Sequence, residues 1–458
     1  MTRRAYPKYK DSGIPWIEEI PGHWHVERLK HVSSVQLSNV DKVSDENEIP
    51  VRLCNYVDVY YNDFIHEALD FMSATATREE IRRFRLRQGD VLITKDSEAW
   101  DDIAVPACVV DEREDLLCGY HLAHIRPHIN RVDGRYLFRA FCSRGINDQF
   151  RVAATGVTRF GLGKYWIDNG VFPVPPLPEQ RAIAAFLDRE TARIDGLIEK
   201  KQRQIELLQE KRAALISHAV TKGLPAAAAA QEGLDPDVPM KDSGIEWLGQ
   251  IPEHWEIKQL RRLTPDSRPI MYGIVLPGPD VADGVPIVKS GDIHARRLNL
   301  ESLCKTTTEI ESRYERSRLR GGDIVYSIRG SIGDCDLVPD ELRGANLTQD
   351  AARVSPRRGV RSRWLLYMLR SRYAFGALEA GALGATIRGI NIWDLKRVRV
   401  PFPDEAEQEA IATFLDRETA RIDTLIAKVG EAIERLKEYR TALISAAVTG
   451  KIDVRGEG

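Results

Sequence analysis

Three closely spaced histidines are the first residues whose types could support chemistry. They are His121, His124 and His128, and a zinc site built on them would need a further ligand and a supporting shell of hydrogen bonds. Their spacing matches no established ligand pattern, and Pro127 interrupts the group. We interpret them as polar loop or strand histidines and expect no metal site.

The motifs of nucleotide binding and catalysis are absent from the sequence. The segment Gly161-Leu162-Gly163-Lys164-Tyr165 has neither the spacing nor the hydroxyl residue of a phosphate-binding P-loop, and no glycine-rich dinucleotide motif follows a strand. Asp90 and Lys95 lie near each other, but Ile93-Thr94-Lys95 lacks the carboxylate that a metal-dependent nuclease places two residues before its lysine. We therefore expect a protein that is not an enzyme.

Arginine clusters with interleaved aromatic residues indicate a different chemistry, contact with phosphate. They occupy residues 82–87, 313–320 and 357–364. The alternative interpretation is a solvated helix face paired with neighbouring glutamates, and a single cluster does not decide between the two. The first two clusters each precede a Gly-Asp pair and a strand-like run, which favours a functional role.

An internal repeat organises these residues. Lys10-Asp11-Ser12-Gly13-Ile14 recurs 231 residues later at 241–245, and the IPGHW segment that ends at Trp24 recurs as IPEHW ending at Trp255. Phe186–Asp195 recurs unchanged at Phe414–Asp423, with an offset of 228 residues. The chain therefore consists of two half-length copies, which would give one chain the pseudo-two-fold symmetry of a homodimer.

Each copy ends in a segment with the pattern of a long amphipathic helix. Apolar residues recur in steps of three, four and seven from Ile183 to Ala219, and again from Ile411 to Ala447. Each helix would hold about 40 residues and span roughly 60 Å, so it needs a partner stripe for stability. The other helix of the same chain is the nearest partner; a zipper between separate chains is the alternative.

Composition and turn signals divide each copy further. Short strand-like runs follow Gly-Asp turns at Val91–Thr94 and Ile324–Ser327, which indicates globular blocks of mixed α/β structure. Asp404 is an expected helix N-cap, and Gly223 and Gly450 are expected helix ends. We divide the chain into a first block with the N-terminal similar segment (1–176), a central long helix (177–223), a linker (224–240), a second block (241–403), and a C-terminal long helix with its tail (404–458).

Net charge and cysteine content limit which binding partners and which cellular compartment are expected. The chain of 458 residues has a net charge of −2, but the first block carries −3 and the second +6. The six cysteines form no CxxC pair, which fits a reducing environment, and no apolar run is long enough to span a membrane. We expect a cytoplasmic protein.

The motifs together resemble the specificity (S) subunits of type I restriction-modification systems. The resemblance is carried by Pro176–Ile183 (PLPEQRAI) leading into Phe186-Leu187-Asp188, by the two KDSGI openings, and by the Gly-x-Thr stretches that begin at Gly156 and Gly384. It covers nearly the whole chain. The second copy departs from the pattern at Pro401–Gln408, and the negative charge of the first block is unexpected for a DNA reader.

The resemblance implies a mixed α/β fold in which two target recognition domains are separated by two long antiparallel coiled-coil helices. It implies a non-catalytic subunit that recognises a bipartite sequence in double-stranded DNA, one half-site per domain. Two methyltransferase (M) subunits would dock on the helices, and motor-nuclease (R) subunits would join that core. S-adenosylmethionine, ATP and Mg would bind those partners, with no cofactor in this chain and no contact with a membrane.

Candidate site residues follow from side-chain chemistry and from the resemblance, because Arg, Lys, Asn, Gln and Asp are the types that contact phosphates and base edges. For DNA binding we select Arg85, Arg87, Lys95, Asp96 and Arg159 in the first block, and Arg318, Arg320, Arg329, Asn346, Gln349 and Arg388 in the second. For partner binding we select the helix residues Phe186, Leu187, Ile194, Phe414, Leu415 and Ile422.

Two other classes of protein stay open on the sequence. One is a stand-alone sequence-specific DNA-binding protein, which would bind its site tightly without a methyltransferase. The other is a coiled-coil scaffold for proteins, whose assembled complex would not bind DNA.

Overall fold

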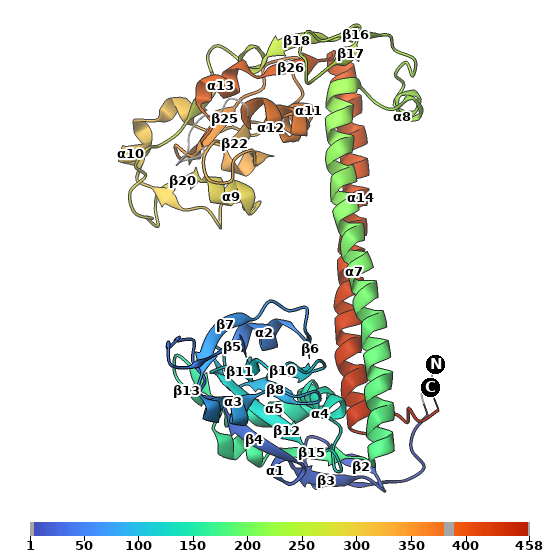
Figure 1. The fold of residues 1–458 in the computed structure, drawn as a ribbon. Coiled ribbons are helices and arrows are strands. Elements are labelled where there is room, and N and C mark those ends of the chain that lie inside the picture. Colours follow the sequence, from blue (N-terminus) through green and yellow to red (C-terminus); the bar gives the residue numbers. More distant parts are fainter. Residues whose placement is uncertain (1–3, 380–388, 457–458) are drawn as a thin grey trace. The chain divides into compact units, whose positions relative to one another are not determined.

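The computed structural model describes residues 4–379 and 389–456, and they fall into two compact units (Figure 1). Unit 1 comprises residues 1–202 and 431–458, and unit 2 comprises residues 203–430. The division runs through both long helices rather than between the two sequence copies. Each unit therefore combines the globular block of one copy with helical residues from both copies.

The block of unit 1 is built around the strand that follows its Gly-Asp turn. Its strands are β1 (Tyr9–Asp11), β2 (Glu19–Pro21), β3 (His25–Arg28), β4 (Ser33–Leu37), β5 (Ile49–Cys54), β6 (Phe64–Ile65), β7 (Met72–Ala76), β8 (Val91–Thr94), β9 (Asp96–Ser97), β10 (Pro106–Val109), β11 (Leu116–Cys118), β12 (Leu122–Pro127), β13 (Thr155–Gly156), β14 (Phe160–Gly161) and β15 (Val171–Val174). Its short helices are α1 (Leu29–Val32), α2 (Tyr56–Tyr61), α3 (Arg78–Phe84), α4 (Gly134–Phe141), α5 (Arg144–Ala153) and α6 (Lys164–Asp168). The strand β8 is the middle of a five-stranded sheet in the order β4-β12-β8-β10-β6, and β9 extends a small sheet in the order β13-β14-β9.

The block of unit 2 repeats this plan, but its central sheet has four strands instead of five. Its strands are β16 (Met240–Asp242), β17 (Gln250–Pro252), β18 (Glu256–Gln259), β19 (Met271–Tyr272), β20 (Val285–Val288), β21 (Lys305–Thr306), β22 (Ile324–Ser327), β23 (Cys335–Leu337), β24 (Asn346–Leu347), β25 (Ala351–Val354) and β26 (Arg399–Phe402). Its helices are α8 (Ala226–Gln231), η1 (Leu260–Leu263), α9 (Ser290–His294), α10 (Thr308–Ser312), η2 (Glu315–Ser317), η3 (Asp340–Leu342), α11 (Ser362–Arg370), α12 (Arg372–Glu379) and α13 (Ile392–Arg397). The strand β22 lies between β25 and β23, in the place that β8 has in unit 1.

The two predicted long helices are present, and both are slightly longer than expected. They are α7 (Leu177–Lys222, 46 residues) and α14 (Glu405–Val448, 44 residues). The carboxylate of Asp404 accepts a hydrogen bond from the backbone of Glu407 (2.8 Å), as expected for an N-cap. The helix α7 ends directly before Gly223, whose φ of +85° suits a helix C-terminus.

Ion pairs across the helix pair fix its direction within each unit. In unit 1, Arg440 Nε of α14 lies 2.9 Å from Asp195 Oδ1 of α7, and in unit 2 Arg212 Nε of α7 lies 2.9 Å from Asp423 Oδ1 of α14. An early residue of one helix thus meets a late residue of the other, so the helices are antiparallel (Figure 1). Arg440 and Asp423 are the repeat counterparts of Arg212 and Asp195, so the two pairs are one contact made twice.

Each core is completed by the end of the other copy's helix. In unit 1 the core formed by the first block and Leu187 of α7 includes Ile444 and Val448 of α14. In unit 2 the core formed by the second block and Leu415 of α14 includes Ile216, Ala219 and Val220 of α7. Neither half of the sequence therefore closes its own core.

A glutamate near the start of each long helix joins it to the IPxHW segment. Trp24 Nε1 donates to Glu179 Oε1 (3.1 Å), and Trp255 Nε1 donates to Glu407 Oε2 (2.8 Å). A histidine from the same segment lies 2.8 Å from each carboxylate. Both indole rings are fully buried, so these carboxylates satisfy donors that have no access to water.

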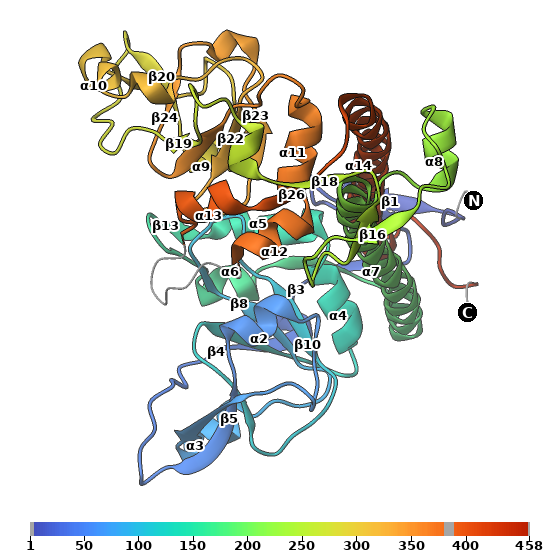
Figure 2. The ribbon, with the colours of Figure 1, turned by 90° about the horizontal axis from the view of Figure 1, so that it is seen from above.

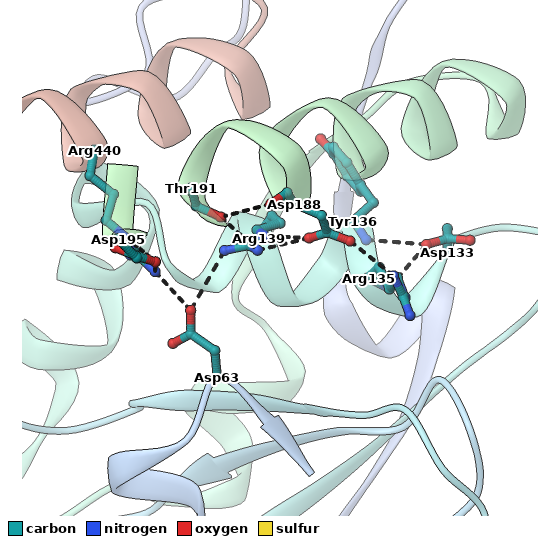
Figure 3. A network of polar contacts seen from close by, with 9 residues as sticks. All are labelled: Asp63, Asp133, Arg135, Tyr136, Arg139, Asp188, Thr191, Asp195 and Arg440. Carbon is teal, nitrogen blue, oxygen red and sulfur yellow. Dashed lines mark hydrogen bonds and ion pairs between the residues drawn. The ribbon is translucent and has the colours of Figure 1, made fainter. Parts of the chain in front are cut away.

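An aspartate further along each long helix joins that helix to a short helix of the globular block, which is α4 in unit 1 and α11 in unit 2. In unit 1, Asp188 accepts from Arg139 Nη2 (2.7 Å) and Arg135 Nη1 (3.0 Å), both on α4, as Figure 3 shows. In unit 2, the counterpart Asp416 accepts from Tyr367 OH (2.6 Å) and pairs with Arg363 Nη2 (2.5 Å), both on α11. The helices α4 and α11 accordingly lie against α7 and α14 (Figure 2).

The expected linker is partly helical. The alanine run forms α8, in which Ala228 and Ala229 are buried, and Glu232 just beyond it pairs with Arg417 of α14 (2.7 Å). The segment therefore packs on unit 2, because its alanines bury apolar surface that an extended linker would expose.

Removing the carboxylate of Glu407 should destabilise unit 2. The substitution Glu407→Ala leaves the buried Trp255 Nε1 without its acceptor, and we expect a loss of about 1–3 kcal/mol in the apparent free energy of unfolding. Chemical unfolding measures it. The matched control is Glu309→Ala, at an exposed pair, which should change stability by no more than about 0.5 kcal/mol. Equal losses in both variants would contradict this role.

Candidate nucleic-acid interface

The repeated Gly-Asp pair builds the turn before the central strand of each block. Gly89 and Gly322 have φ values of +88° and +82°, a left-handed conformation that glycine adopts at little cost. The next residues, Asp90 and Asp323, each accept a hydrogen bond from the backbone N–H three residues earlier (2.8 Å). The repeated pair is therefore structural, and it fixes where β8 and β22 begin.

Both of these aspartates are buried and hydrogen-bonded to basic side chains. Asp90 Oδ2 lies 2.7 Å from His124 Nε2 and from Arg126 Nη2, while Asp323 Oδ2 lies 2.6 Å from Arg268 Nη2. Burial alone would raise the pKa of Asp90, but the hydrogen bonds from His124 and Arg126 outweigh it and hold this pKa below its ordinary value. Asp90 therefore stays ionised and anchors the strand.

Charged side chains gather where β8 ends, and we call this the first strand-end site. Lys95 Nζ and His121 Nδ1 lie 2.8 and 2.7 Å from the same oxygen of Asp96. Lys95 Nζ also lies 4.9 Å from the ring centroid of Tyr120. Arg159 is exposed in the turn between β13 and β14, two residues before Gly161, which pairs with Asp96 of β9.

The second strand-end site lies where β22 ends. Arg329 is exposed there and Gln349 is half-buried, and both line a hollow of about 510 Å³. Tyr272 and Asn391 also line it. Arg388 lies outside the described residues.

Three of the selected residues are engaged in the protein's own structure. Arg318 binds Glu311 through Nε and Nη2, each at 2.7 Å. Asn346 is fully buried, and its amide donates to Glu311 and to the backbone of Tyr314. Arg85 pairs with Glu112 (3.4 Å) and is two-thirds buried. Their contact with DNA stays a prediction, and the structure gives each of them a partner within the chain; the neighbouring Arg87 and Arg320 are exposed.

The three histidines do not converge. His121 contacts Asp96 and His124 contacts Asp90, whereas the exposed His128 donates its backbone N–H to Val32 O. Within residues 4–379 and 389–456, no group of three or more His, Cys, Asp or Glu side chains is arranged to hold a metal ion.

The helix residues selected for partner binding are buried in the chain's own cores. The exposed fraction is 2% for Phe186, 0% for Leu187, 1% for Ile194, 7% for Phe414, 0% for Leu415 and 5% for Ile422. The apolar stripe was expected to serve partners as well as the intrachain pair. It is used by the intrachain packing, because each stripe faces the block and the other helix.

Exposed aromatic residues instead form a groove at an equivalent place in each unit. In unit 1 the groove lies between Trp16, α5 and Tyr165 and Trp166 of α6, and in unit 2 between Trp247, α12 and α13, which carries the exposed Trp393. Trp16 and Trp247 belong to the two KDSGI openings and are 50% and 69% exposed. Sequence reasoning missed these grooves, although the repeated tryptophan was their signal.

Tyr120, Tyr272 and Asn391 were also missed as neighbours of the strand-end sites. Tyr272 of β19 and Asn391 lie more than 100 residues apart in the sequence, so no spacing marks them as neighbours, and Tyr120 directly precedes His121. Alignment of the two Gly-Asp strands would have located the sites, because each lies beyond the end of such a strand.

The sequence comparisons agree with this architecture. A family model described as the type I restriction modification DNA specificity domain matches residues 279–435. The type I restriction enzyme EcoBI specificity subunit of Escherichia coli is 26% identical over 341 residues, covering 74% of this chain and 70% of the relative. The MjaX specificity subunit of Methanocaldococcus jannaschii is 25% identical over 460 residues, covering 98% of each chain.

Solved structures share the fold. The HsdS subunit from Thermoanaerobacter tengcongensis aligns with a TM-score of 0.55 at 18% identity, and a chain from a study of complex assembly and conformational transition of the type I R-M system aligns with a TM-score of 0.63 at 18% identity. Each alignment covers 94% of this chain and 98% of the other. At this identity the likeness establishes the duplicated α/β fold with two long helices.

Fold and repeat define a duplicated α/β protein whose two blocks each pack on a pair of long helices. The chain belongs to the family of type I restriction-modification specificity (HsdS) subunits, and it is the non-catalytic DNA-specificity subunit of such a system. This membership selects among the three classes left open by the sequence. In the part of the chain that the structure describes, no helix has both the length and the hydrophobicity to cross a membrane.

Loss of the Asp90 charge should have a pH-dependent effect. In Asp90→Asn, the buried His124 and the half-buried Arg126 lose their ionised partner, and we expect about 3 kcal/mol lower stability at pH 7. Because the folded-state pKa of Asp90 lies below its ordinary value, the native contribution is present above about pH 4 and fades as pH falls through the lowered pKa.

The difference between wild type and Asp90→Asn should therefore shrink below about pH 4, as measured by urea unfolding at several pH values. The control is Asp101→Asn, an exposed carboxylate of the same block. A difference that stays constant from neutral to acid pH would rule out the Asp90 charge as its cause.

Proposed function

We propose that the chain recognises a bipartite sequence in double-stranded DNA, with one half-site contacted by each strand-end site. The observation that carries this proposal is the duplication of the site: each block presents polar side chains at the end of the strand after its Gly-Asp turn, charged in the first block and charged and amide in the second. A duplicated reader implies two read segments. An unread gap lies between them when the readers are on separate blocks.

We divide the candidate residues into those that would specify bases and those that would position the DNA backbone. Lys95 and Asp96 in the first site, and Arg329 and Gln349 in the second, have side chains that can bond base edges in the major groove. The exposed Arg87, Arg159 and Arg320 are candidates for phosphate contacts, which fix orientation without carrying sequence information. Arg388 stays a candidate for either role.

The proposed partners and cofactors are those that the family resemblance implies. We propose that two methyltransferase subunits and, in the full enzyme, motor-nuclease subunits assemble on this chain, and that they bind S-adenosylmethionine, ATP and Mg. The complex would act in the cytoplasm, a reducing compartment that suits six free cysteines.

The long helices are proposed to act as the ruler between half-sites. Four residues inserted after Gln202 in α7, and four after Gly430 in α14, leave the contacts inside each unit intact because the units divide there. Each insertion adds about 6 Å and turns the helix by about 400°, a net 40°. B-DNA advances about 3.4 Å and turns about 34–36° per base pair.

Cells that carry the double insertion should methylate the same two half-sites with a gap longer by one or two base pairs. Methylome sequencing measures the motif, and the unmodified chain is the control. Methylation that persists with an unaltered gap would show that the helices do not set the spacing. A wild-type motif that is not bipartite would overturn the proposed function itself.

Partner docking is proposed on the two aromatic grooves. A partner that binds twice must find the same surface twice, and the two grooves lie at equivalent places and each contain the exposed tryptophan of a KDSGI opening. Tryptophan is the side chain that most often dominates binding energy at interfaces. The methyltransferase subunit, expected in two copies, is the occupant we propose.

Substitution of the groove tryptophans should remove methyltransferases one at a time. We expect Trp16→Ala and Trp247→Ala each to weaken one of two binding events by about 30-fold or more, and the double variant to weaken both. Native mass spectrometry of the complex with the methyltransferase counts the bound subunits. Trp100→Ala, another exposed tryptophan, is the matched control. Loss in Leu197→Ala and Leu425→Ala, at the repeated exposed leucines of the long helices, but not in the tryptophan variants would assign docking to the helices.

A further inference from the structure

Backbone hydrogen bonds show which residues of the two strand-end sites are equivalent. The last residue of β8, Thr94, pairs with Leu122, and the last residue of β22, Ser327, pairs with Ala351. One step beyond, the backbone N–H of residue 95 donates to the carbonyl of residue 121 (3.0 Å), and that of residue 328 donates to the carbonyl of residue 350 (2.9 Å). Asp96 and Arg329 therefore occupy the same structural position, one residue further on.

These equivalent positions carry opposite charges. Both contacts of Asp96, from Lys95 and His121, are made by Oδ2; among the described residues Oδ1 has no hydrogen-bond partner. Burial alone would raise the pKa of Asp96, but these two hydrogen bonds outweigh it and hold the pKa below its ordinary value. The carboxylate therefore stays ionised at neutral pH, with one oxygen available as an acceptor.

The side chain of Arg329 is an exposed donor without an acidic partner. Within residues 4–379 and 389–456 its guanidinium makes no ion pair, and the nearby carboxylate of Asp350 instead accepts from the backbone of Ser290 and from Thr348. A guanidinium has five N–H donors and no acceptor, whereas an ionised carboxylate only accepts. The two sites thus present opposite hydrogen-bonding character at one shared position.

Base edges in the major groove discriminate between these two characters. Cytosine N4 and adenine N6 are donors that suit a carboxylate, and guanine O6 and N7 are acceptors that suit an arginine. We infer that unit 1 selects, at one position of its half-site, a base whose amino group lies in the major groove, cytosine or adenine, and that unit 2 selects guanine at the corresponding position of its half-site. This inference rests on the proposed function, since it assumes that both sites face base pairs.

The experiment uses the full chain in complex with its methyltransferase partner and a randomised duplex DNA library. Wild type should select cytosine or adenine at one position of one half-site and guanine at one position of the other. Asp96→Asn keeps the size of the side chain but adds donors, so discrimination against guanine and thymine at that position should fall about tenfold or more. Arg329→Gln should lose the guanine preference in the other half-site and tolerate adenine.

Each variant carries its own folding control, because the half-site read by the other unit should be selected as in wild type. The surface variants Glu79→Gln and Arg343→Gln are matched controls for the loss of each charge and should leave both half-sites unchanged. An unaltered first half-site in Asp96→Asn, or an unaltered second half-site in Arg329→Gln, would overturn the inference while the bipartite motif still stood. If the wild-type complex selects no bipartite motif, the proposed function fails instead.

Discussion

The structure depends on the exchange of helix ends between the two sequence copies. Unit 1 needs Ile444 and Val448 of α14 to close its core, and unit 2 needs Ile216 and Val220 of α7. Each long helix therefore packs against its own block with its first half and against the other block with its last. A substitution in either helix end acts on the opposite block, which explains why the tails are much more similar to each other than the blocks are.

Hydrogen bonds between helix aspartates and block side chains allow this exchange although the sequences of the two blocks differ. The helix supplies the acceptor in each case, and the block supplies whatever donor its own sequence offers. Asp188 takes the guanidinium of the fully buried Arg139, and Asp416 takes the hydroxyl of Tyr367. Because a carboxylate accepts from either group, a block can change its docking residue without a change in the helix.

The sequence was sufficient for features that depend on local periodicity or on duplication. The long helices, their caps at Asp404 and Gly223, and the strands after the Gly-Asp turns are all of this kind. It was insufficient wherever a partner lies far away in the chain. Arg318 has the composition of a phosphate contact, yet Glu311 neutralises it, and the buried stripe residue Leu187 has the pattern of a docking surface. Spacing encodes which face of an element is apolar, but not which surface covers that face.

Net charge is a poor guide to DNA contact for the same reason. A lone carboxylate that enters a groove lined by phosphates is repelled by them. Asp96 avoids this because Lys95 and His121 lie within 2.8 Å of its Oδ2. With Lys95 charged, the pair that it forms with Asp96 is already neutral. A block with a net charge of −3 can therefore present an acceptor to a base edge, since the charge that matters is the one within a few ångströms of the contact rather than the sum over the block.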